Sequence, residues 1–169
     1  GKMAAGLIRG IQKNGTAACL KHFACNNQEL QRFQSDSIMD ERTLREIYLS
    51  GFETAVKEGK PETIMCAYNK INGVHASDDK RLLTDFLRGE WGFDGLVMTD
   101  WGAMNDRIEG FKAGCDLNMP GGSDYMMKDC RKAVKAGTLS ETEIDACARR
   151  VIALAIKERN RTNTAFDRD

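Results

Sequence analysis

The residues that could do chemistry in this chain lie at the ends of short apolar runs. Asp100 and Trp101 directly follow the run at 96–99, where a buried strand would give way to a loop. Lys21 and His22 lie at the end of an earlier run. Two further runs, at 63–68 and 115–119, carry other polar residues, namely Tyr68, Asn69, Asp116 and Asn118. Because a charge beside an apolar strand is costly unless it is paired or used, this repeated arrangement indicates a shared site.

A carboxylate among aromatic, cationic and hydroxyl groups suits a polyhydroxylated ligand. Sugar rings stack on an indole, and sugar hydroxyls accept hydrogen bonds from lysine, histidine and arginine. Each residue type also has a structural explanation, since lysine extends its charged end into solvent, tyrosine lies at wet rims and aspartate forms turns. Their joint occurrence at successive strand ends favours an active-site cluster.

Hydrophobic periodicity predicts strands that alternate with helices. Apolar runs predict strands at 16–23, 63–68, 96–100 and 115–119. Residues at helical spacing predict helices around 1–14, 44–56, 82–87, 106–113, 126–134 and 140–155. The last helix begins with a capping box at Ser140 and Glu143, and Asn72 with Gly73 predicts a turn. Between these elements, residues 26–40 read as a polar loop that contains Arg32.

This alternation indicates an α/β fold with a parallel sheet flanked by helices. Neither common glycine-rich phosphate loop is present in the sequence, which disfavours a nucleotide-binding doubly wound fold. We therefore predict a partial, half TIM-type (β/α) barrel with four parallel strand–helix units. In such a barrel the active site forms at the C-terminal ends of the strands, where the polar residues of this chain fall.

The composition of the chain argues against nucleic-acid and membrane partners. At 169 residues, with 25 acidic and 25 basic side chains, the chain has the length of one domain and no charge bias towards nucleic acid. No apolar run approaches the length of a membrane span, so we expect neither a membrane partner nor a secretory leader. The 6 cysteines form no CxxC pair, and we interpret them as reduced core thiols, which suggests a cytoplasmic location.

Four motifs resemble glycoside hydrolase family 3, most closely its bacterial β-glucosidase branch. They are KHFACNNQE at 21–29, DERTLREIY at 40–48, MCAYNKING at 65–73 and GFDGLVMTDWG at 92–102. The resemblance implies that residues 1–159 are the C-terminal portion of the family's N-terminal barrel domain. Residues 160–169 would then begin an interdomain linker or tail.

The resemblance implies a role for each matching residue. Asp100 matches the catalytic nucleophile of a retaining β-glycosidase, which forms a covalent glycosyl-enzyme. The matching substrate-binding residues are Lys21, His22, Arg32, Met65, Tyr68 and Trp101. Neither a metal nor an organic cofactor is implied, and the implied substrate is a terminal β-linked sugar such as glucose or xylose. The pattern of the family's N-acetylglucosaminidase-type members is absent, because Ala24 and Cys25 follow Phe23.

Two departures from the family pattern matter. Thr99 stands where the family commonly has serine, which is a mild change. More seriously, the family's acid/base glutamate comes from a second domain, and the earlier half of the barrel supplies further sugar contacts. Within this chain Glu29 and Asp116 are candidates for the acid by their proximity to the motifs alone. We therefore expect a fragment that is inactive by itself and that pairs with the rest of the enzyme or self-associates, because open sheet edges pair.

Two other readings of the sequence remain open. The first is a Schiff-base aldolase with Lys21 as the amine nucleophile, since desolvated lysines on barrel strands can react in this way. The second is a non-catalytic half barrel that binds sugar or is purely structural. The missing phosphate loop counts against the aldolase, and sugar binding without turnover would support the non-catalytic reading.

Overall fold

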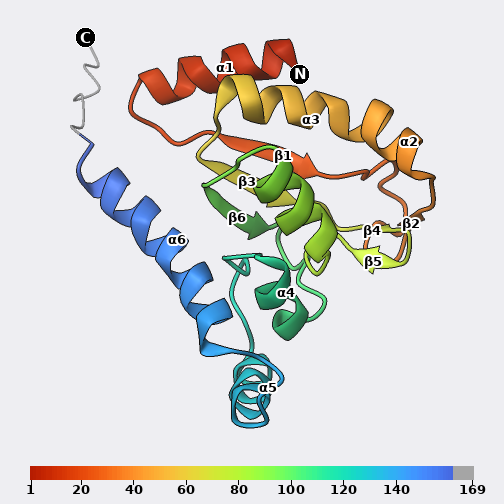
Figure 1. Ribbon diagram of the computed structural model, residues 1–169, viewed down its shortest axis with the longest axis vertical. Helices are drawn as coiled ribbons and strands as arrows, with labels where there is room; N and C mark the ends of the chain where they lie inside the picture. The colour runs from red at the N-terminus through yellow and green to blue at the C-terminus, as the bar shows by residue number, and fades with distance from the viewer. Residues whose placement is uncertain (162–169) are drawn as a thin grey trace.

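The computed structural model describes residues 1–161, which form a parallel sheet with helices along one side (Figure 1). The strands are β1 (Cys19–Phe23), β3 (Thr63–Cys66) and β6 (Leu96–Thr99), in the order β1-β3-β6. Each strand pairs in parallel with the next one along the chain. The predicted α/β fold with a parallel sheet is therefore confirmed, and the C-terminal ends of all three strands share one edge.

The fourth predicted strand, at 115–119, is not confirmed as a strand. This segment forms a single parallel bridge, between Met98 and Leu117. The amides of Asp116 and Leu117 both donate to the carbonyl oxygen of Val97, so the segment does follow β6 for a short distance. Pro120 has no backbone N–H to continue a ladder, which limits the pairing.

Helices connect consecutive strands. The chain begins with α1 (Lys2–Lys13), and one continuous helix between β1 and β3 comprises α2 (Glu41–Thr43), η1 (Leu44–Leu49), α3 (Ser50–Thr54) and η2 (Ala55–Gly59), where η marks π-helical hydrogen bonding. Then η3 (Arg81–Glu90) joins β3 to β6, and α4 (Arg107–Ala113), α5 (Asp124–Lys135) and α6 (Glu141–Arg159) follow. No helix within residues 1–161 is long and apolar enough to cross a membrane.

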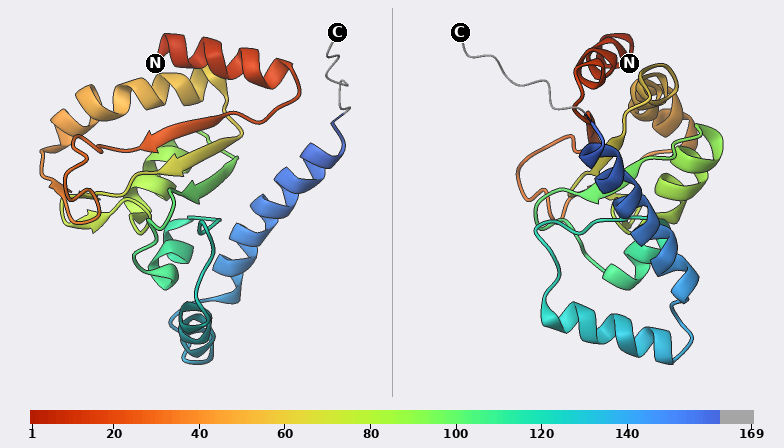
Figure 2. Two further views of the ribbon diagram at one scale, coloured as in Figure 1. Left: turned by 180° about the vertical axis from the view of Figure 1, so that it is seen from behind. Right: turned by 90° about the vertical axis from the view of Figure 1, so that its left-hand side faces the viewer.

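The hydrophobic core lies between these helices and one face of the sheet. Ile64 and Val97, which are neighbours in the register of β3 and β6, are fully buried against Leu49 and Leu83 of the helices. The right-hand view of Figure 2 shows α3 and η3 on the same side of the sheet. Cover by helices accounts for the burial of this face of the sheet, whereas continuous apolar runs are typical of strands that are covered on both faces.

The opposite face of the sheet is partly open. Met65 and Met98 are neighbours in the register of β3 and β6, and both are partly exposed. Cys19 and Lys21 of β1 are exposed. Residues of a strand alternate between its two faces. On this face Met65 and Met98 are partly exposed, whereas Thr63 and Leu96, at the start of the same strands, are buried.

One predicted helix face is partly wrong. The helical spacing within 44–56 puts Ile47 on the same apolar face as Leu44, but Ile47 is 68% exposed, whereas Leu49 is buried. These residues lie in η1, whose wider turns change the spacing of side chains around the helix. A pattern of α-helical period therefore assigns the wrong side chains to the core in this segment.

Helix α6 is also less buried than its sequence suggests. Its capping box is confirmed, but of the five residues expected to be buried (Ile144, Cys147, Val151, Leu154 and Ala155) Cys147 alone is fully buried. The helix leans away from the sheet in Figure 1. A cleft of about 450 Å³ separates its C-terminal half from the N-terminal ends of β3 and β6, and Glu62, Gly95 and Leu154 are among the residues that line it.

A second, small sheet forms from segments that were expected to be loops. It contains β2 (Asp36–Ser37), β4 (Lys70–Ile71) and β5 (Val74–His75), with β2 parallel and β5 antiparallel to β4. The predicted turn at Asn72 and Gly73 joins β4 to β5, and both residues have positive φ angles (49° and 91°). These angles are typical of two-residue hairpin turns. The small sheet fixes the loop after β1 beside the loop after β3.

The six cysteines are free. Five of them are buried, and Cys19 is exposed. This placement confirms the interpretation that most of the thiols belong to the core, where a free cysteine behaves as a small apolar residue.

Candidate active site

Asp100 lies one residue beyond the end of β6, at the shared C-terminal edge of the sheet. Its backbone N–H donates to the carbonyl oxygen of Cys66 (3.2 Å), so the sheet still fixes this residue. The chain then turns through Gly102, whose φ of 79° suits glycine, and the N–H of Gly102 donates to the carbonyl oxygen of Met119 (2.8 Å). Backbone bonds on both sides therefore hold the Asp100 carboxylate in place.

The two oxygens of the Asp100 carboxylate have different surroundings. Oδ1 accepts hydrogen bonds from the Tyr68 hydroxyl (2.9 Å) and from the Trp101 backbone N–H (2.6 Å). Oδ2 lies 3.3 Å from Nε2 of His22, which comes from an irregular part of β1 where the strand register shifts. The side chain is 17% exposed, so the carboxylate is held by protein groups but is still open on one side.

Tyr68 is the buried donor of this site. Its side chain follows β3 and is only 5% exposed, and its hydroxyl oxygen also lies 3.1 Å from the Trp101 carbonyl oxygen. Burial, and next the hydrogen bond to the Asp100 carboxylate, raise the pKa of the Tyr68 phenol above its ordinary value of 10.0. Tyr68 therefore stays protonated and able to donate at neutral pH.

The loop after β1 places a cation over the Tyr68 ring. The guanidinium carbon of Arg32 lies 4.1 Å from the centroid of that ring, within the range of a cation–π contact. The ring of Phe33 packs against Tyr68 with 4.5 Å between centroids. Phe33 was not identified from the sequence, where an aromatic residue beside Arg32 in a polar loop was the one available signal.

The side chains of the remaining predicted site residues, Lys21, Met65 and Trp101, make no hydrogen bond or ion pair with Asp100. Lys21 is exposed on β1, and its amine makes no hydrogen bond or ion pair with residues 1–161. Met65 is partly exposed on the uncovered face of the sheet, and the Trp101 side chain is 62% exposed. The structure therefore joins His22, Tyr68 and Arg32 to Asp100 through direct or successive contacts. The side chains of Lys21, Met65 and Trp101 remain partly or fully open to solvent.

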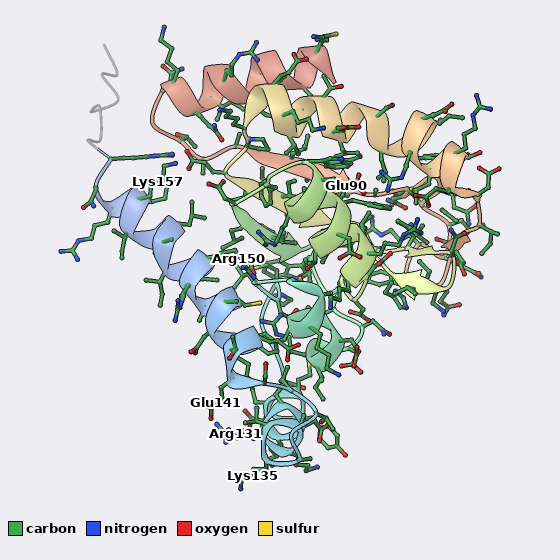
Figure 3. The ribbon with its side chains drawn as sticks, viewed as in Figure 1. Glu90, Arg131, Lys135, Glu141, Arg150 and Lys157 are labelled. Carbon is green, nitrogen blue, oxygen red and sulfur yellow. The ribbon has the colours of Figure 1, made fainter. Side chains whose placement is uncertain are left out.

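Asp116 belongs to a buried network and not to the open site. Its side chain is 0% exposed and accepts from Arg88 of η3 (2.9 Å), from Arg150 of α6 (2.7 Å) and from the Val97 backbone N–H (2.8 Å). Figure 3 shows Arg150 reaching from α6 towards the sheet. Asp116 is thus unavailable as a general acid, and sequence reasoning missed the two arginines that pair with it.

Asp78 fastens the loop that follows Asp100, a role that the sequence did not reveal. It accepts from the Asn105 side-chain amide (2.8 Å) and from the Asp106 backbone N–H (3.2 Å). Its neighbour Ser77 donates to the carbonyl oxygen of Ala103 (3.2 Å). Burial raises the pKa of the Asp78 carboxyl above its ordinary value of 3.8. The loop after β5 therefore restrains the segment beside the Asp100 carboxylate.

The arrangement has the parts of a nucleophilic site. A carboxylate is held by two neutral donors and faces a histidine, and an arginine and an exposed indole lie nearby. Such a carboxylate can attack an electrophilic carbon, and the surrounding donors can bind hydroxyl groups. Within residues 1–161, no three or more histidine, cysteine, aspartate or glutamate side chains are grouped as a candidate metal site.

The fold and the site define an α/β protein with a carboxylate-centred site at the C-terminal ends of parallel strands. The family model for the glycosyl hydrolase family 3 N terminal domain matches residues 1–154, so the chain belongs to this family. The chain is 47% identical over 170 aligned positions to thermostable beta-glucosidase B of Acetivibrio thermocellus, an alignment that covers 99% of this chain. It is also 46% identical to an exo-alpha-(1->6)-L-arabinopyranosidase of Bifidobacterium longum, over 94% of this chain.

Solved structures give the same result. The beta-glucosidase 3B of Thermotoga neapolitana, solved in complex with glucose, superposes with a TM-score of 0.87 at 45% identity over 92% of this chain and 23% of that protein. A Bifidobacterium adolescentis GH3 beta-glucosidase gives 0.86 at 43% identity, also over 92% of this chain and 23% of that protein. The chain spans 22% of the length of the A. thermocellus relative and 21% of the B. longum relative.

Proposed function

We propose that this chain carries the nucleophile of a retaining β-glycosidase that removes terminal β-linked sugars, with Asp100 as the attacking group. The observation that carries the proposal is the state of the Asp100 carboxylate: Oδ1 is fixed by Tyr68 and the Trp101 amide, while the side chain remains 17% exposed. A fixed carboxylate with one open side is what attack on an anomeric carbon requires. Glucose bound to the T. neapolitana relative supports a glucoside as the substrate.

The substrate-binding roles are part of the same proposal. His22 and Arg32 lie within the contacts that surround Asp100, and they would bind sugar hydroxyls together with Lys21. The exposed indole of Trp101 would stack on a sugar ring, while Met65 and the donor Tyr68 would line the pocket. No metal or organic cofactor takes part in this chemistry.

The acid/base residue is proposed to come from another part of a longer protein. A retaining enzyme needs a second carboxyl group about 5–5.5 Å from the first. Glu29 is bonded through both oxygens, to Asn26 (2.8 Å) and to Arg32 (2.6 Å), and Asp116 is fully buried between arginines. Neither is free to protonate a leaving group.

We also propose a position for the chain in its domain, which the partly open sheet face supports. Residues 1–159 would be the C-terminal portion of a (β/α) barrel domain, most similar to the bacterial β-glucosidase branch, and the last residues would begin a linker. Helix α6 ends at Arg159, and of the predicted linker 160–169 all but Asn160 and Arg161 lie outside the described residues. The earlier half of the barrel would then cover Met65 and Met98. The free thiols suit a reducing, cytoplasmic location.

Covalent labelling tests the nucleophile directly. The full-length protein is incubated with 2-deoxy-2-fluoro-β-glucosyl fluoride, whose activated leaving group does not require the acid, and its intact mass is recorded. We expect one stoichiometric adduct on Asp100 and none in Asp100→Asn. An adduct on a different residue, or undiminished labelling of Asp100→Asn, would refute the assignment. The same measurement on the 169-residue chain shows whether this piece assembles the site alone.

The structure gives less support to the two other hypotheses, the Schiff-base aldolase and the non-catalytic half barrel. A Schiff-base lysine is activated by burial, and Lys21 is exposed. A purely structural or sugar-binding role does not account for the convergence of Tyr68, the Trp101 amide and His22 on one carboxylate. Borohydride trapping with carbonyl substrates tests the aldolase, and saturable glucose binding without turnover in the full-length protein would favour the non-catalytic role.

A further inference from the structure

Arg32 needs an anchor if it is to serve the site. It lies in a loop with its side chain 37% exposed, and a long, flexible side chain loses rotamer entropy when it is fixed. A single cation–π contact with the Tyr68 ring offsets only part of that loss. This contact alone therefore does not hold the guanidinium in one place, and a second restraint is required.

Glu29 supplies that restraint. Its Oε2 accepts from Nη1 of Arg32 (2.6 Å), and its Oε1 accepts from the Asn26 side-chain amide (2.8 Å). The Arg32 backbone N–H also donates to the Glu29 carbonyl oxygen (3.3 Å). Asn26 follows the end of β1 closely, so the Glu29 carboxylate links the sheet to the arginine. The hydrogen bond that Arg32 donates to the Glu29 carboxylate raises the pKa of Arg32, so the guanidinium stays charged.

The chain of contacts continues to the nucleophile. Glu29 holds Arg32, Arg32 lies over the ring of Tyr68, and the Tyr68 hydroxyl donates to Asp100. We infer that Glu29 is a positioning residue that acts through Arg32: it holds the guanidinium over Tyr68, where Arg32 can bind the sugar beside Asp100. This inference rests on the proposed function and gives a role to a carboxylate that the sequence offered as an acid. A displacement of about 1 Å at a binding group is enough to weaken substrate positioning.

A double-mutant cycle in the full-length protein tests this role. Glu29→Gln, Arg32→Gln and the double variant are compared with an aryl β-glucoside as substrate. We expect Glu29→Gln to raise KM about 10-fold and to change kcat less than about 3-fold, because a binding group is lost and the nucleophile is kept. If Glu29 acts through Arg32, the double variant matches Arg32→Gln alone. Independent, multiplicative effects would overturn the inference.

A matched control separates positioning from loss of a surface ion pair. Glu46 pairs with Arg42 at 3.1 Å, and its side chain is 62% exposed compared with 69% for Glu29. We expect Glu46→Gln to leave KM and kcat unchanged. Glu29→Asp keeps the charge but shortens the reach, so its KM is expected to fall between those of the wild type and Glu29→Gln.

A crystal structure of the Glu29→Gln protein gives a readout that does not depend on activity. We expect the Arg32 guanidinium to have left the Tyr68 ring, and a guanidinium still about 4.1 Å from the ring centroid would overturn the inference. If the wild-type protein neither hydrolyses β-glycosides nor labels at Asp100, the proposed function fails. The crystal structure would still decide whether Glu29 positions Arg32.

Discussion

Two aspartates beside β6 have opposite surroundings: Asp100 follows the C-terminal end of the strand, and Asp116 lies beside Val97 in its N-terminal half. Asp100, after β6, is 17% exposed and contacts Tyr68, the Trp101 amide and His22. Asp116, in the next segment, is 0% exposed and contacts two arginines and a backbone amide. Both follow apolar runs and look alike in the sequence. Their chemistry is decided by the neighbours that each one meets.

The difference shows how one fold gives two carboxylates different environments, one partly open with neutral donors and one fully buried between arginines. Paired with Arg88 and Arg150, Asp116 has its charge compensated on both oxygens, and it links η3, β6 and α6. Asp100 has two neutral donors on Oδ1 and His22 beside Oδ2, and its side chain remains 17% exposed. Neutral donors hold a carboxylate in place and leave its negative charge uncompensated, whereas the arginines of a buried ion pair compensate that charge.

The largest expected effect is on catalysis at Asp100. Asp100→Asn keeps the shape of the side chain but removes the carboxylate that we propose as the nucleophile, so turnover of an aryl β-glucoside by the full-length protein should fall at least about 1000-fold. The thermal unfolding midpoint should change little, because the side chain lies at the surface of the site. A large loss of stability in Asp100→Asn would contradict the proposal that Asp116 contributes to folding stability and Asp100 does not.

The converse result is expected at Asp116. Asp116→Asn leaves Arg88 and Arg150 without their buried counter-charge, and this should lower the free energy of unfolding by about 3–5 kcal/mol. Urea unfolding of the full-length protein measures the change. Asp129→Asn, which removes an exposed ion pair with Lys132 on α5, is the control and should cost less than about 1 kcal/mol. Equal effects of the two variants would contradict the structural role of Asp116.

A smaller effect is expected when the neutral donor is removed. Tyr68→Phe deletes the hydrogen bond to Asp100, and kcat/KM should fall about 10- to 100-fold because a bond to a charged group contributes about 1.5–3 kcal/mol. The raised pKa of the Tyr68 phenol also predicts a pH effect. Its contribution to folding is complete below pH 10 and is lost as the pH rises through the folded-state pKa, so alkaline unfolding of Tyr68→Phe should lack this component. An unchanged kcat/KM would show that the donor is dispensable.

The smallest effect is expected at Asp78, which is partly buried and has neutral hydrogen-bond donors as Asp100 does. Its pKa is raised, so its contribution to folding is greatest below pH 3.8 and is lost as the pH rises through the folded-state pKa. Asp78→Asn should remove this pH dependence and change stability at pH 7 by about 1 kcal/mol or less. Chemical unfolding between pH 3.5 and pH 7 measures it. A steeper pH dependence in the variant would contradict burial of the Asp78 carboxyl as the cause of its raised pKa.

Some elements of this fold were predictable because their signals are local. The strands at β3 and β6, the helix starting at the Ser140 capping box and the turn at Asn72 and Gly73 follow from short patterns of apolar, capping and turn residues. The π-helical segment η1 was not predictable from periodicity, and it exchanged Ile47 for Leu49 in the core. The small sheet was not predicted because each of its strands is only two residues long. In addition, β2 pairs with β4, which lies far from it in the sequence.

By itself, the sequence determined which side chains arrive at the edge of the sheet. His22, Tyr68 and Asp100 each stand at the end of a predicted strand, and the ends of parallel strands meet at one edge of the sheet. The tertiary structure decided what each carboxylate does, because charge compensation depends on residues far apart in the chain. Arg150 lies 34 residues from Asp116, and Tyr68 lies 32 residues from Asp100. Such contacts leave no local pattern, since the energies of burial and pairing are fixed only when the helices and strands have packed.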